Sequence, residues 1–278
     1  MNYIEVMKRL EDLASHDPKD LAGMARFGIN IDKAWVISIP KLRILAKEIK
    51  KSVISTEVEK SRSLGYARDD KTGSKALHKL ALQVWDSGVH EAQILASMID
   101  EPKFVTEVQM EKWVLGFDSW DVCDQVCGNL FDKTEFAIKK AREWSERPEE
   151  FVKRAGFVIM AWLAVHNKGL EDSIFVEFLE IIKRQSGDNR NFVRKAVNWA
   201  LRSIGKSRNK YLYEKAIETT NVILNQCEKS KIRVLDPSYA QDDRFNDQEY
   251  LKEIKAMNFI AGDAKRELEK DYIKNRFI

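Results

Sequence analysis

The 278-residue sequence combines 44% hydrophobic with 33% charged residues, a balance typical of a globular protein that is long enough to bury a sizeable core. Its 47 lysines and arginines barely exceed its 44 acidic residues, so any affinity for a polyanion has to come from where the positive charges lie. Residues 1–20 carry acidic and basic side chains throughout, and no run approaches the roughly 18 apolar residues of a membrane span. We therefore expect a soluble, cytoplasmic protein with no membrane partner.

Apolar residues recur at intervals of three and four along nearly every long segment, which predicts an all-α protein. Pro40 fits the first turn of a helix capped by Ser38, and the break at 86–88 separates two more helices. Further helices are expected at about 107–115, 118–130, 134–146, 149–165, 171–186, 190–204 and 209–228. The charged segments 50–75 and 229–250 interrupt this pattern. We interpret the first as a partly helical connector with a mobile loop, the second as a surface excursion, and 248–278 as a charged helical end.

Two short blocks repeat each other and predict how the helices are arranged. Residues 151–155 read Phe-Val-Lys-Arg-Ala and residues 192–196 read Phe-Val-Arg-Lys-Ala, with a looser copy at 89–93. Their spacing lies within the ~40–47-residue period of HEAT-like and armadillo-like arrays. The sequence thus predicts one α-α solenoid domain over 1–278, monomeric, with Lys153, Arg154, Arg194 and Lys195 on one basic groove. A groove of this kind favours nucleic acid as the partner.

The segment from Phe117 to Gln125 is the most informative short stretch. Trp120 and Asp124 are one helical turn apart and share a face. Asp118 is the expected helix cap, but Asp124 lies beyond the first turn among apolar neighbours, where a carboxylate needs a partner or a purpose. One alternative is structural, a buried ion pair between Asp124 and Arg154. The other is a functional carboxylate beside an indole.

Five blocks of the chain, in this order, resemble the AlkD-type DNA alkylation-repair family. The resemblance extends over about residues 20–210. It rests on residues 24–27 (Met-Ala-Arg-Phe), 39–47 (Ile-Pro-Lys-Leu-Arg-Ile-Leu-Ala-Lys), 119–124 (Ser-Trp-Asp-Val-Cys-Asp), 151–155 and 195–202 (Lys-Ala-Val-Asn-Trp-Ala-Leu-Arg). It implies a HEAT-like superhelix whose concave face binds double-stranded DNA. Active members are glycosylases that release cationic N3- and N7-alkylated purines.

Carried over by motif, the resemblance implies a catalytic carboxylate at Asp124, a cradle for the lesion or sugar at Trp120 and Trp199, and a phosphate clamp at Arg154. An alkylated purine is already a good leaving group, so the reaction needs chiefly a carboxylate that stabilises the oxocarbenium-like sugar and orients a water. Indole faces attract cations. Other expected phosphate ligands are Lys153, Arg194, Lys195, Arg202, Lys206 and Arg208, with weaker claims for Arg26 and Arg43.

Two departures from the family pattern favour other functions. Position 119 is serine, where well-known active members carry a second tryptophan, and the charged segments 50–75 and 229–250 are additional. The main alternative is therefore a non-catalytic HEAT-like module that binds DNA or protein through the same groove. A scaffold that binds only protein is a weaker alternative.

The remaining histidines, cysteines and tryptophans are expected to have structural rather than functional roles. The four histidines are dispersed, and Cys123 and Cys127 share a helix face without a matching pair of ligands, so we expect buried thiols and no metal site. Glycine-rich phosphate loops are missing from the sequence, so no nucleotide cofactor is expected. Trp113, Trp144 and Trp162 are predicted to lie in the core.

Overall fold

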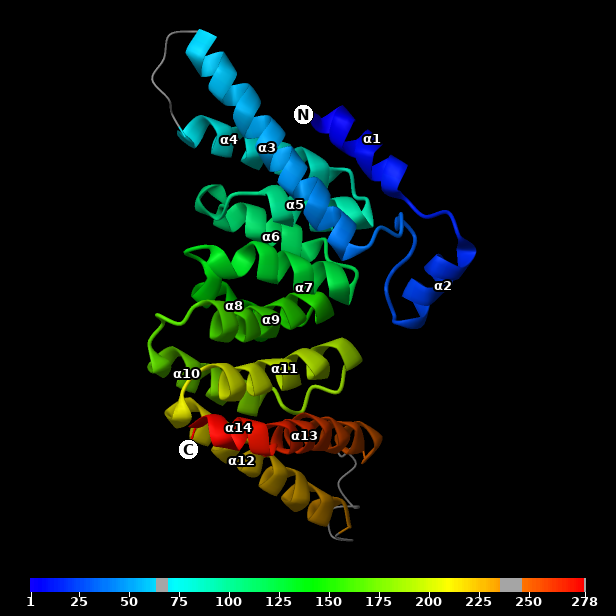
Figure 1. Ribbon diagram of the computed structural model, residues 1–278. Helices are drawn as coiled ribbons and strands as arrows, with labels where there is room; N and C mark the ends of the chain where they lie inside the picture. The colour runs from blue at the N-terminus through cyan, green and yellow to red at the C-terminus, as the bar shows by residue number, and fades with distance from the viewer. Residues whose placement is uncertain (64–69, 236–246, 278) are drawn as a thin grey trace. The chain divides into compact units, whose positions relative to one another are not determined.

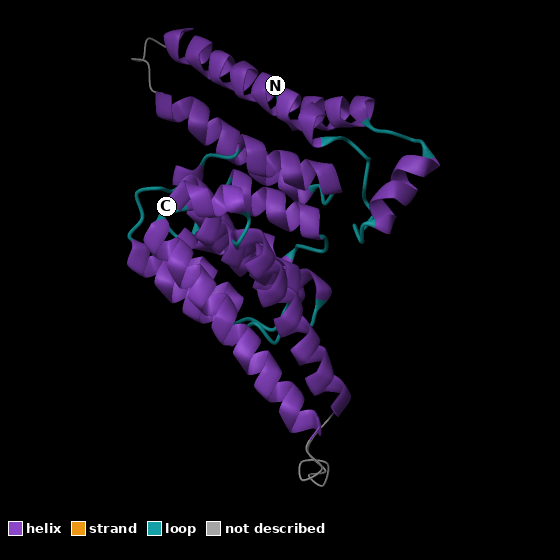
Figure 2. Cartoon of the chain, turned by 60° about the horizontal axis from the view of Figure 1, so that its bottom comes forward, coloured by secondary structure: helices purple, strands orange, loops and turns teal. Residues whose placement is uncertain are grey.

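The computed structural model describes residues 1–63, 70–235 and 247–277, and within these ranges all regular secondary structure is helical (Figure 2). This confirms the predicted all-α class. The chain divides into two compact units, residues 1–137 and 138–278. The expectation of a single domain over 1–278 stays a prediction. Within the described residues, no helix is both long and apolar enough to cross a bilayer.

Unit 1 contains seven α-helices among its described residues, shown from blue to green in Figure 1. They are α1 (Tyr3–Leu13), α2 (Pro18–Arg26), α3 (Ile39–Ser63), α4 (Asp70–Asp86), α5 (His90–Ile99), α6 (Glu107–Leu115) and α7 (Trp120–Asn129), with 3-10 turns η1 (Pro102–Phe104) and η2 (Phe131–Lys133). The predicted break after Asp86 is confirmed, and Gly88 there has a φ of 69°, which favours glycine. Pro40 lies in the first turn of α3, as predicted, where the missing N–H costs nothing.

The core of unit 1 lies between successive helices: α3 packs on α4 and α5, and α5 packs on α7. Trp85 and Trp113 stack in it with ring centroids 4.0 Å apart. Trp113 is buried, as predicted. The charged segment 50–75 is more helical than expected, because α3 runs to Ser63 and buries Val53 on its inner face. The mobile loop that we predicted within 50–75 is not present at residues 70–75, which form the start of α4, and residues 64–69 lie outside the described residues.

Helix α2 differs from the other helices of unit 1, because none of its residues is buried. Asp17 caps its start by accepting the N–H of Lys19 at 2.9 Å, and the chain leaves it through Gly28, whose φ is 73°. Figure 1 and Figure 2 both show α2 beside the stacked helices, with loops at each end. Its position therefore depends on a few loop contacts rather than on core packing.

Unit 2 consists of α8 (Ala137–Ser145), α9 (Glu150–His166), α10 (Asp172–Arg184), α11 (Asn191–Ser207), α12 (Lys210–Leu235), α13 (Asp247–Leu268) and α14 (Asp271–Phe277). Helix α9 packs along α11, and α11 and α12 both pack on α13 (Figure 1). The helical end expected over 248–278 corresponds, within the described residues, to α13 and α14. The surface excursion predicted at 229–250 falls partly on residues 236–246, outside the described residues, and its first part continues α12.

The repeated blocks form equivalent first turns of α9 and α11. Phe151 and Phe192 contact each other with ring centroids 5.5 Å apart, while Ala155 and Ala196 are fully buried between helices. The repeat thus encodes the packing of one helix start on the next. This physical reason for the pattern agrees with a repeat architecture.

Candidate functional site

Trp120 is the first residue of α7, and its indole is held by a loop that is distant in the sequence. The indole Nε1–H donates to the Phe27 carbonyl at 3.0 Å. Close by, the Asn30 amide donates to the Asp118 carboxylate at 2.8 Å. Trp120 is half-buried, so one part of the ring packs while another remains accessible. These two bonds tie the segment after α2 to the start of α7 and restrict the orientation of the indole.

Ser119, not Asp118, occupies the cap position of α7, so our expectation for Asp118 was wrong. Asp118 is exposed and is engaged by Asn30 instead. The Ser119 carbonyl accepts the N–H of Cys123, and its fully buried hydroxyl donates to Asp121 Oδ1 at 2.6 Å. A tryptophan at this buried position would not fit without repacking. The serine is therefore an integral part of the packing at the start of α7.

Asp124 follows Trp120 by one turn of α7 and is half-buried. Its neighbours Cys123 and Cys127 are buried thiols, as predicted. Burial, the Cys123 thiol and the nearby carboxylates, including that of Asp124, raise the pKa of Cys127 well above its usual value. The thiol therefore stays protonated and is a poor nucleophile. Among the groups on this face of α7, Asp124 is the one suited to stabilise a developing cation.

A buried ion pair connects His90, at the start of α5, to Asp121, in the first turn of α7. His90 Nε2 and Asp121 Oδ2 are 2.8 Å apart, and their side chains are 4% and 18% exposed. Burial alone would lower the pKa of His90, but the hydrogen bond and charge of Asp121 outweigh it and raise the pKa. Burial alone would raise the pKa of Asp121, yet His90 and the Ser119 hydroxyl hold it below its usual value. Both groups are thus stabilised in their charged forms.

Glu91, next to His90, holds a strained loop in place. Its carboxylate is buried and accepts the backbone N–H groups of Trp35 at 2.8 Å and Ile37 at 3.2 Å. The residue between them, Val36, has a φ of 55°, a conformation that is costly for a β-branched side chain. Strain of this kind persists only where the surroundings enforce it. Glu91 supplies that constraint at one wall of a cleft.

The cleft has a volume of about 640 Å³ and is lined by α2, the 27–38 loop, the start of α3, and the His90–Asp121 pair. Met24 and Phe27 contribute apolar wall, which explains why the apolar face of α2 is not buried in the core. The volume is within the range of about 300–1,000 Å³ of small-molecule sites. Because Phe27 also accepts the hydrogen bond of Trp120, the cleft adjoins the predicted Trp120–Asp124 face.

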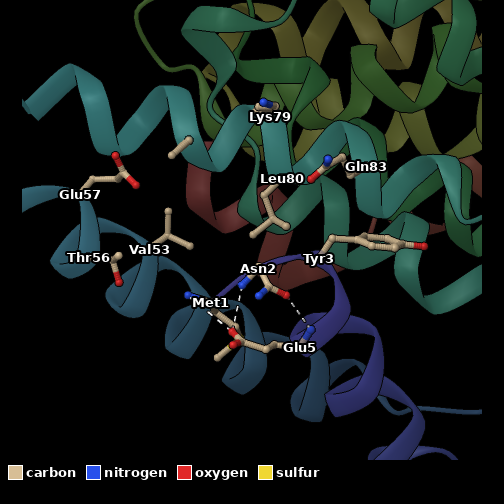
Figure 3. A pocket seen from close by; sticks show the side chains of 11 residues that line it. Met1, Asn2, Tyr3, Glu5, Val53, Thr56, Glu57, Lys79, Leu80 and Gln83 are labelled. Carbon is tan, nitrogen blue, oxygen red and sulfur yellow. Dashed lines mark hydrogen bonds and ion pairs between the residues drawn. The ribbon is translucent and has the colours of Figure 1, made fainter. Parts of the chain in front are cut away.

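Another cavity of unit 1 is similar in size but differs in chemistry. It has a volume of about 620 Å³ between α1, α3 and α4, and polar groups dominate its lining (Figure 3). Asn2 and Glu5 line it, and they are engaged with each other in the capping box that begins α1. None of the residues predicted from the sequence lies there. We do not assign a function to it.

Unit 1 also carries a basic groove of about 400 Å³ that the sequence pattern indicated only through Arg43. Arg43 and Lys47 lie one turn apart on the exposed side of α3, and Lys50 and Lys133 line the same groove. Lys50 forms an ion pair with Glu101 at 3.6 Å. The exposed cations Arg43, Lys47 and Lys133 suit a phosphate backbone.

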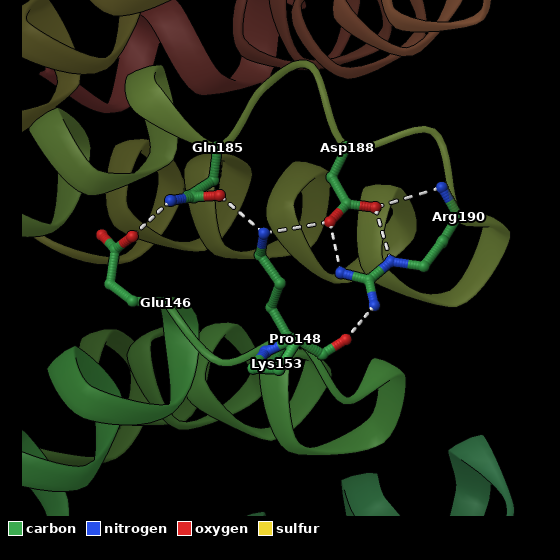
Figure 4. A network of polar contacts seen from close by, with 6 residues as sticks. All are labelled: Glu146, Pro148, Lys153, Gln185, Asp188 and Arg190. Carbon is green, nitrogen blue, oxygen red and sulfur yellow. Dashed lines mark hydrogen bonds and ion pairs between the residues drawn. The ribbon is translucent and has the colours of Figure 1, made fainter. Parts of the chain in front are cut away.

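In unit 2, Lys153 does not lie on an open face, contrary to our expectation. Its ammonium donates to Gln185 at 2.6 Å and pairs with Asp188 at 3.0 Å, and Arg190 bonds the same carboxylate (Figure 4). Although burial opposes it, bonds from Arg190 and Lys153 lower the pKa of Asp188. The physical reason is the loop that joins α10 to α11, which folds over the start of α9. Contact between Lys153 and a phosphate would require this network to open.

Lys153 and Lys195, one lysine from each repeated block, should therefore respond differently to the same change. Lys153→Met is expected to lower the free energy of unfolding by about 2 kcal/mol, because it leaves a buried carboxylate with one partner fewer. Lys195→Met, at an exposed position, should change stability by less than about 0.5 kcal/mol and lower the salt dependence of DNA binding by about one counterion. Urea unfolding and DNA titrations over a salt series measure both effects. A reduced salt dependence in Lys153→Met at unchanged stability would contradict this assignment.

Arg154 is buried, and its Nη1 donates to the Phe192 carbonyl at 2.6 Å, across from α9 to α11. Arg208 is likewise engaged, donating to the carbonyls of Asn167 and Leu170. Both guanidiniums therefore connect elements of unit 2. The predicted pair between Asp124 and Arg154 joins different units and stays a prediction.

The other predicted cations of α11 lie on its exposed or half-buried side. Lys195 is exposed, and the Arg194 guanidinium lies 5.1 Å from the ring centroid of Phe259. Arg202 pairs loosely with Asp263 at 3.6 Å. Lys206 pairs with Glu267 at 2.6 Å. Lys206 and Lys270 together lower the pKa of Glu267 to about 2. Lys195 is thus the most exposed of these cations, and the expectation that they bind phosphate stays a prediction.

Trp199 is half-buried on α11 and meets Trp162 of α9 edge to face, with ring centroids 5.4 Å apart. The prediction of a core position is confirmed for Trp144 but was wrong for Trp162, which is also half-buried. Helix α9 is apolar on almost all sides, so the hydrophobic period could not separate its inner from its outer positions.

The structure brings Trp120 and Asp124 together on α7 of unit 1, and it brings Arg154 and Trp199 into unit 2. Sequence reasoning missed His90, Glu91 and Asp121, although their juxtaposition governs the start of α7. The only signal was polar side chains at the first turns of two apolar helices, which is also what ordinary capping produces. Within the described residues, no group of three or more potential metal-binding side chains is present.

Comparison with known proteins agrees with this fold and these motifs. The model of the family described as DNA alkylation repair enzyme matches residues 6–232. A solved structure superimposes with a TM-score of 0.62 at 20% identity, covering 80% of this chain and 83% of the other. It represents a family described as related to the HEAT-like repeat DNA glycosylases, with affinity for branched DNA structures. A search of curated proteins finds no match. The likeness confirms the HEAT-like repeat fold, and the match over most of its length shows that the chain belongs to the DNA alkylation repair enzyme family.

Proposed function

We propose that this protein binds double-stranded DNA and excises cationic N3- and N7-alkylated purines by hydrolysing the N-glycosidic bond. The observation that carries the proposal is the Trp120–Asp124 pair on one face of α7, with the indole held by the Phe27 carbonyl. Membership of the DNA alkylation repair family supports the choice of DNA as substrate. No cofactor is required by this chemistry.

In the proposed reaction, the bond between the sugar C1′ and the base nitrogen breaks, and the bonding electrons neutralise the positive charge of the purine. The carboxylate of Asp124 stabilises the oxocarbenium-like sugar and orients a water whose oxygen bonds to C1′. The water releases one proton, and the products are the free base and an abasic site. Since the leaving base carries its own charge, no strong general acid is needed.

Indole faces at Trp120 and Trp199 would attract the cationic lesion or sugar by cation–π contact, each contributing about 0.5–2 kcal/mol depending on how far water is excluded. Both rings are half-buried, which leaves part of each accessible. Phosphate contacts are assigned first to Lys195 and Arg194, and in unit 1 to Arg43 and Lys47. Arg154, Arg202 and Lys206 would contribute if DNA competes with their present partners. We expect binding to weaken steeply with salt.

A second candidate function is DNA recognition without base excision. Ser119 favours it, because the buried serine leaves no second tryptophan beside Trp120. The structural relative with affinity for branched DNA structures also favours it. In this case the chain would bind DNA through the same cations, and Asp124 would have no chemical role.

Release of free base from a duplex with a single 7-methylguanine separates these functions. The wild type is compared with a no-protein sample that measures spontaneous depurination at the same temperature. Release well above this background supports excision. Binding of the same duplex with a steep salt dependence but no release supports recognition alone, and absence of both contradicts the two functions together.

A further inference from the structure

Three aromatic rings of unit 2 form a cluster. The proposed excision chemistry uses only one of them, Trp199. Trp162 and His166 on α9 are stacked, with ring centroids 4.6 Å apart and planes inclined by 23°. Trp199 on α11 meets Trp162 at an interplanar angle of 78°. His166 is exposed, and both indoles are half-buried, unlike the fully buried Trp144 of the same unit. Aromatic surface of this extent outside a core indicates a binding role.

The contact between the two indoles leaves part of Trp199 accessible, since this residue is only half-buried. Because the planes of Trp162 and Trp199 are nearly perpendicular, Trp162 covers at most one of the two faces of Trp199. Within the described residues, Trp162 is the sole ring partner of Trp199. An accessible indole ring has the size and polarisability to stack a planar base.

An indole at position 162 carries a free-energy penalty that a purely packing side chain would avoid. Its Nε1–H is buried and has no acceptor among the described residues. A buried donor without an acceptor is unfavourable, and a phenylalanine or leucine would avoid this penalty. Packing alone does not explain an indole at this position.

Positive charge adjoins the rings at the C-terminal ends of α9 and α11. Lys168 donates to the carbonyls of Ala164 at 2.8 Å and Ser207 at 2.5 Å, and it retains a third N–H. Burial lowers the pKa of Lys168, and the nearby positive charges of Arg208 and Arg276 lower it further. Arg202 lies one turn from Trp199 on α11, and its Nε has no acceptor among the described residues.

We infer that Trp162, His166 and Trp199 form a stacking site for an unpaired nucleobase, with the adjoining phosphate held by Lys168 and Arg202. A base inside a duplex has both faces covered by its neighbours, so only an unpaired base presents a face to these rings. The combination of aromatic rings with cations on adjacent helices matches a nucleotide better than an apolar peptide. The inference rests on the proposed function in taking DNA as the partner, but it does not require base excision.

The test uses the full chain and two labelled probes, a blunt duplex and the same duplex carrying a single-stranded arm. Trp162→Leu is expected to weaken binding of the armed probe about tenfold and that of the blunt duplex less than about twofold. Trp162→Phe keeps a ring and should retain most of the affinity for the armed probe. It should not lower the melting temperature, because the unpaired N–H is removed.

His166→Leu is the second variant, because substitutions at exposed positions change stability little. This variant should also weaken binding of the armed probe more than binding of the blunt duplex. Equal losses on both probes, or no loss in either leucine variant, would overturn the stacking site. If the wild type binds the blunt duplex but Trp162→Leu changes nothing, only the stacking site fails. If the wild type binds neither probe, the proposed function fails with it.

Discussion

Replacing Asp124 with asparagine is expected to slow release of 7-methylguanine from duplex DNA by about 100-fold or more. The amide keeps the size of the side chain but removes the negative charge that stabilises the oxocarbenium-like sugar. Loss of a single electrostatic stabiliser of a transition state typically costs about 10²–10³ in rate. Affinity for undamaged duplex should stay within about threefold of wild type, because Asp124 is not a phosphate ligand.

The measurement is a single-turnover time course with protein in excess over the modified duplex. Asp118→Asn is the matched control, since it makes the same chemical change at the entrance to α7 on an exposed carboxylate whose partner is Asn30. We expect this control to retain nearly full activity. Excision by Asp124→Asn at a rate near that of wild type would remove the proposed role of Asp124 while leaving DNA binding in place.

Replacing His90 is expected to destabilise the protein and to change the pH dependence of its stability. His90→Leu leaves the Asp121 carboxylate buried without its cationic partner, for which we expect a loss of about 3 kcal/mol. His90→Gln can still donate a hydrogen bond to Asp121, so the loss should be smaller, about 1–2 kcal/mol. Asp121 keeps its bond from Ser119 in both variants.

The pH window follows from the directions of the two shifts. The pKa of His90 is raised above 6.5, so its stabilisation is complete below pH 6.5 and is lost as the pH rises through the folded pKa. The pKa of Asp121 is lowered below 3.8, so its stabilisation is present above pH 3.8 and is lost as the pH falls through the folded pKa. The difference between wild type and His90→Gln should thus be largest between pH 3.8 and 6.5.

Thermal unfolding of wild type and both variants across this pH range measures the effect. His16 offers a control, because it is exposed, and His16→Gln should follow the wild-type curve. A constant difference between wild type and His90→Gln from pH 4 to 9 would show that the pair does not contribute through charge. Lower activity of the stable fraction of His90→Gln would further indicate that the pair positions Trp120 and Asp124.

The fold could be predicted largely because helical periodicity is a local property. Helix α6 matches its predicted bounds, and the break between α4 and α5 follows from Gly88. The repeated Phe-Val blocks predicted stacked helices, and the contact of Phe151 with Phe192 gives the reason. Prediction was poorest where charge was dense, since charged residues occur equally in loops and on exposed helix faces, as in the extension of α3.

Residue type alone could not distinguish surface cations from structural ones. Lys153 and Arg194 hold the same place in the repeated block, yet Lys153 is buried in a network with Asp188, while Arg194 lies beside Phe259. The difference comes from the α10–α11 loop, which covers the start of α9. That loop contact joins residues more than 30 positions apart and leaves no periodic trace in the sequence.

Spacing along one helix and short motifs were enough to predict the helical class, the repeat architecture, the family and the face of α7 that carries Trp120 and Asp124. The folded chain was needed to find the His90–Asp121 pair, the contact of Glu91 with the backbone on both sides of Val36, the buried state of Lys153 and the cluster of Trp162, His166 and Trp199. These features depend on which side chains of separate helices meet, and on how much water their packing excludes. Packing between helices is specified by the whole core rather than by any one segment.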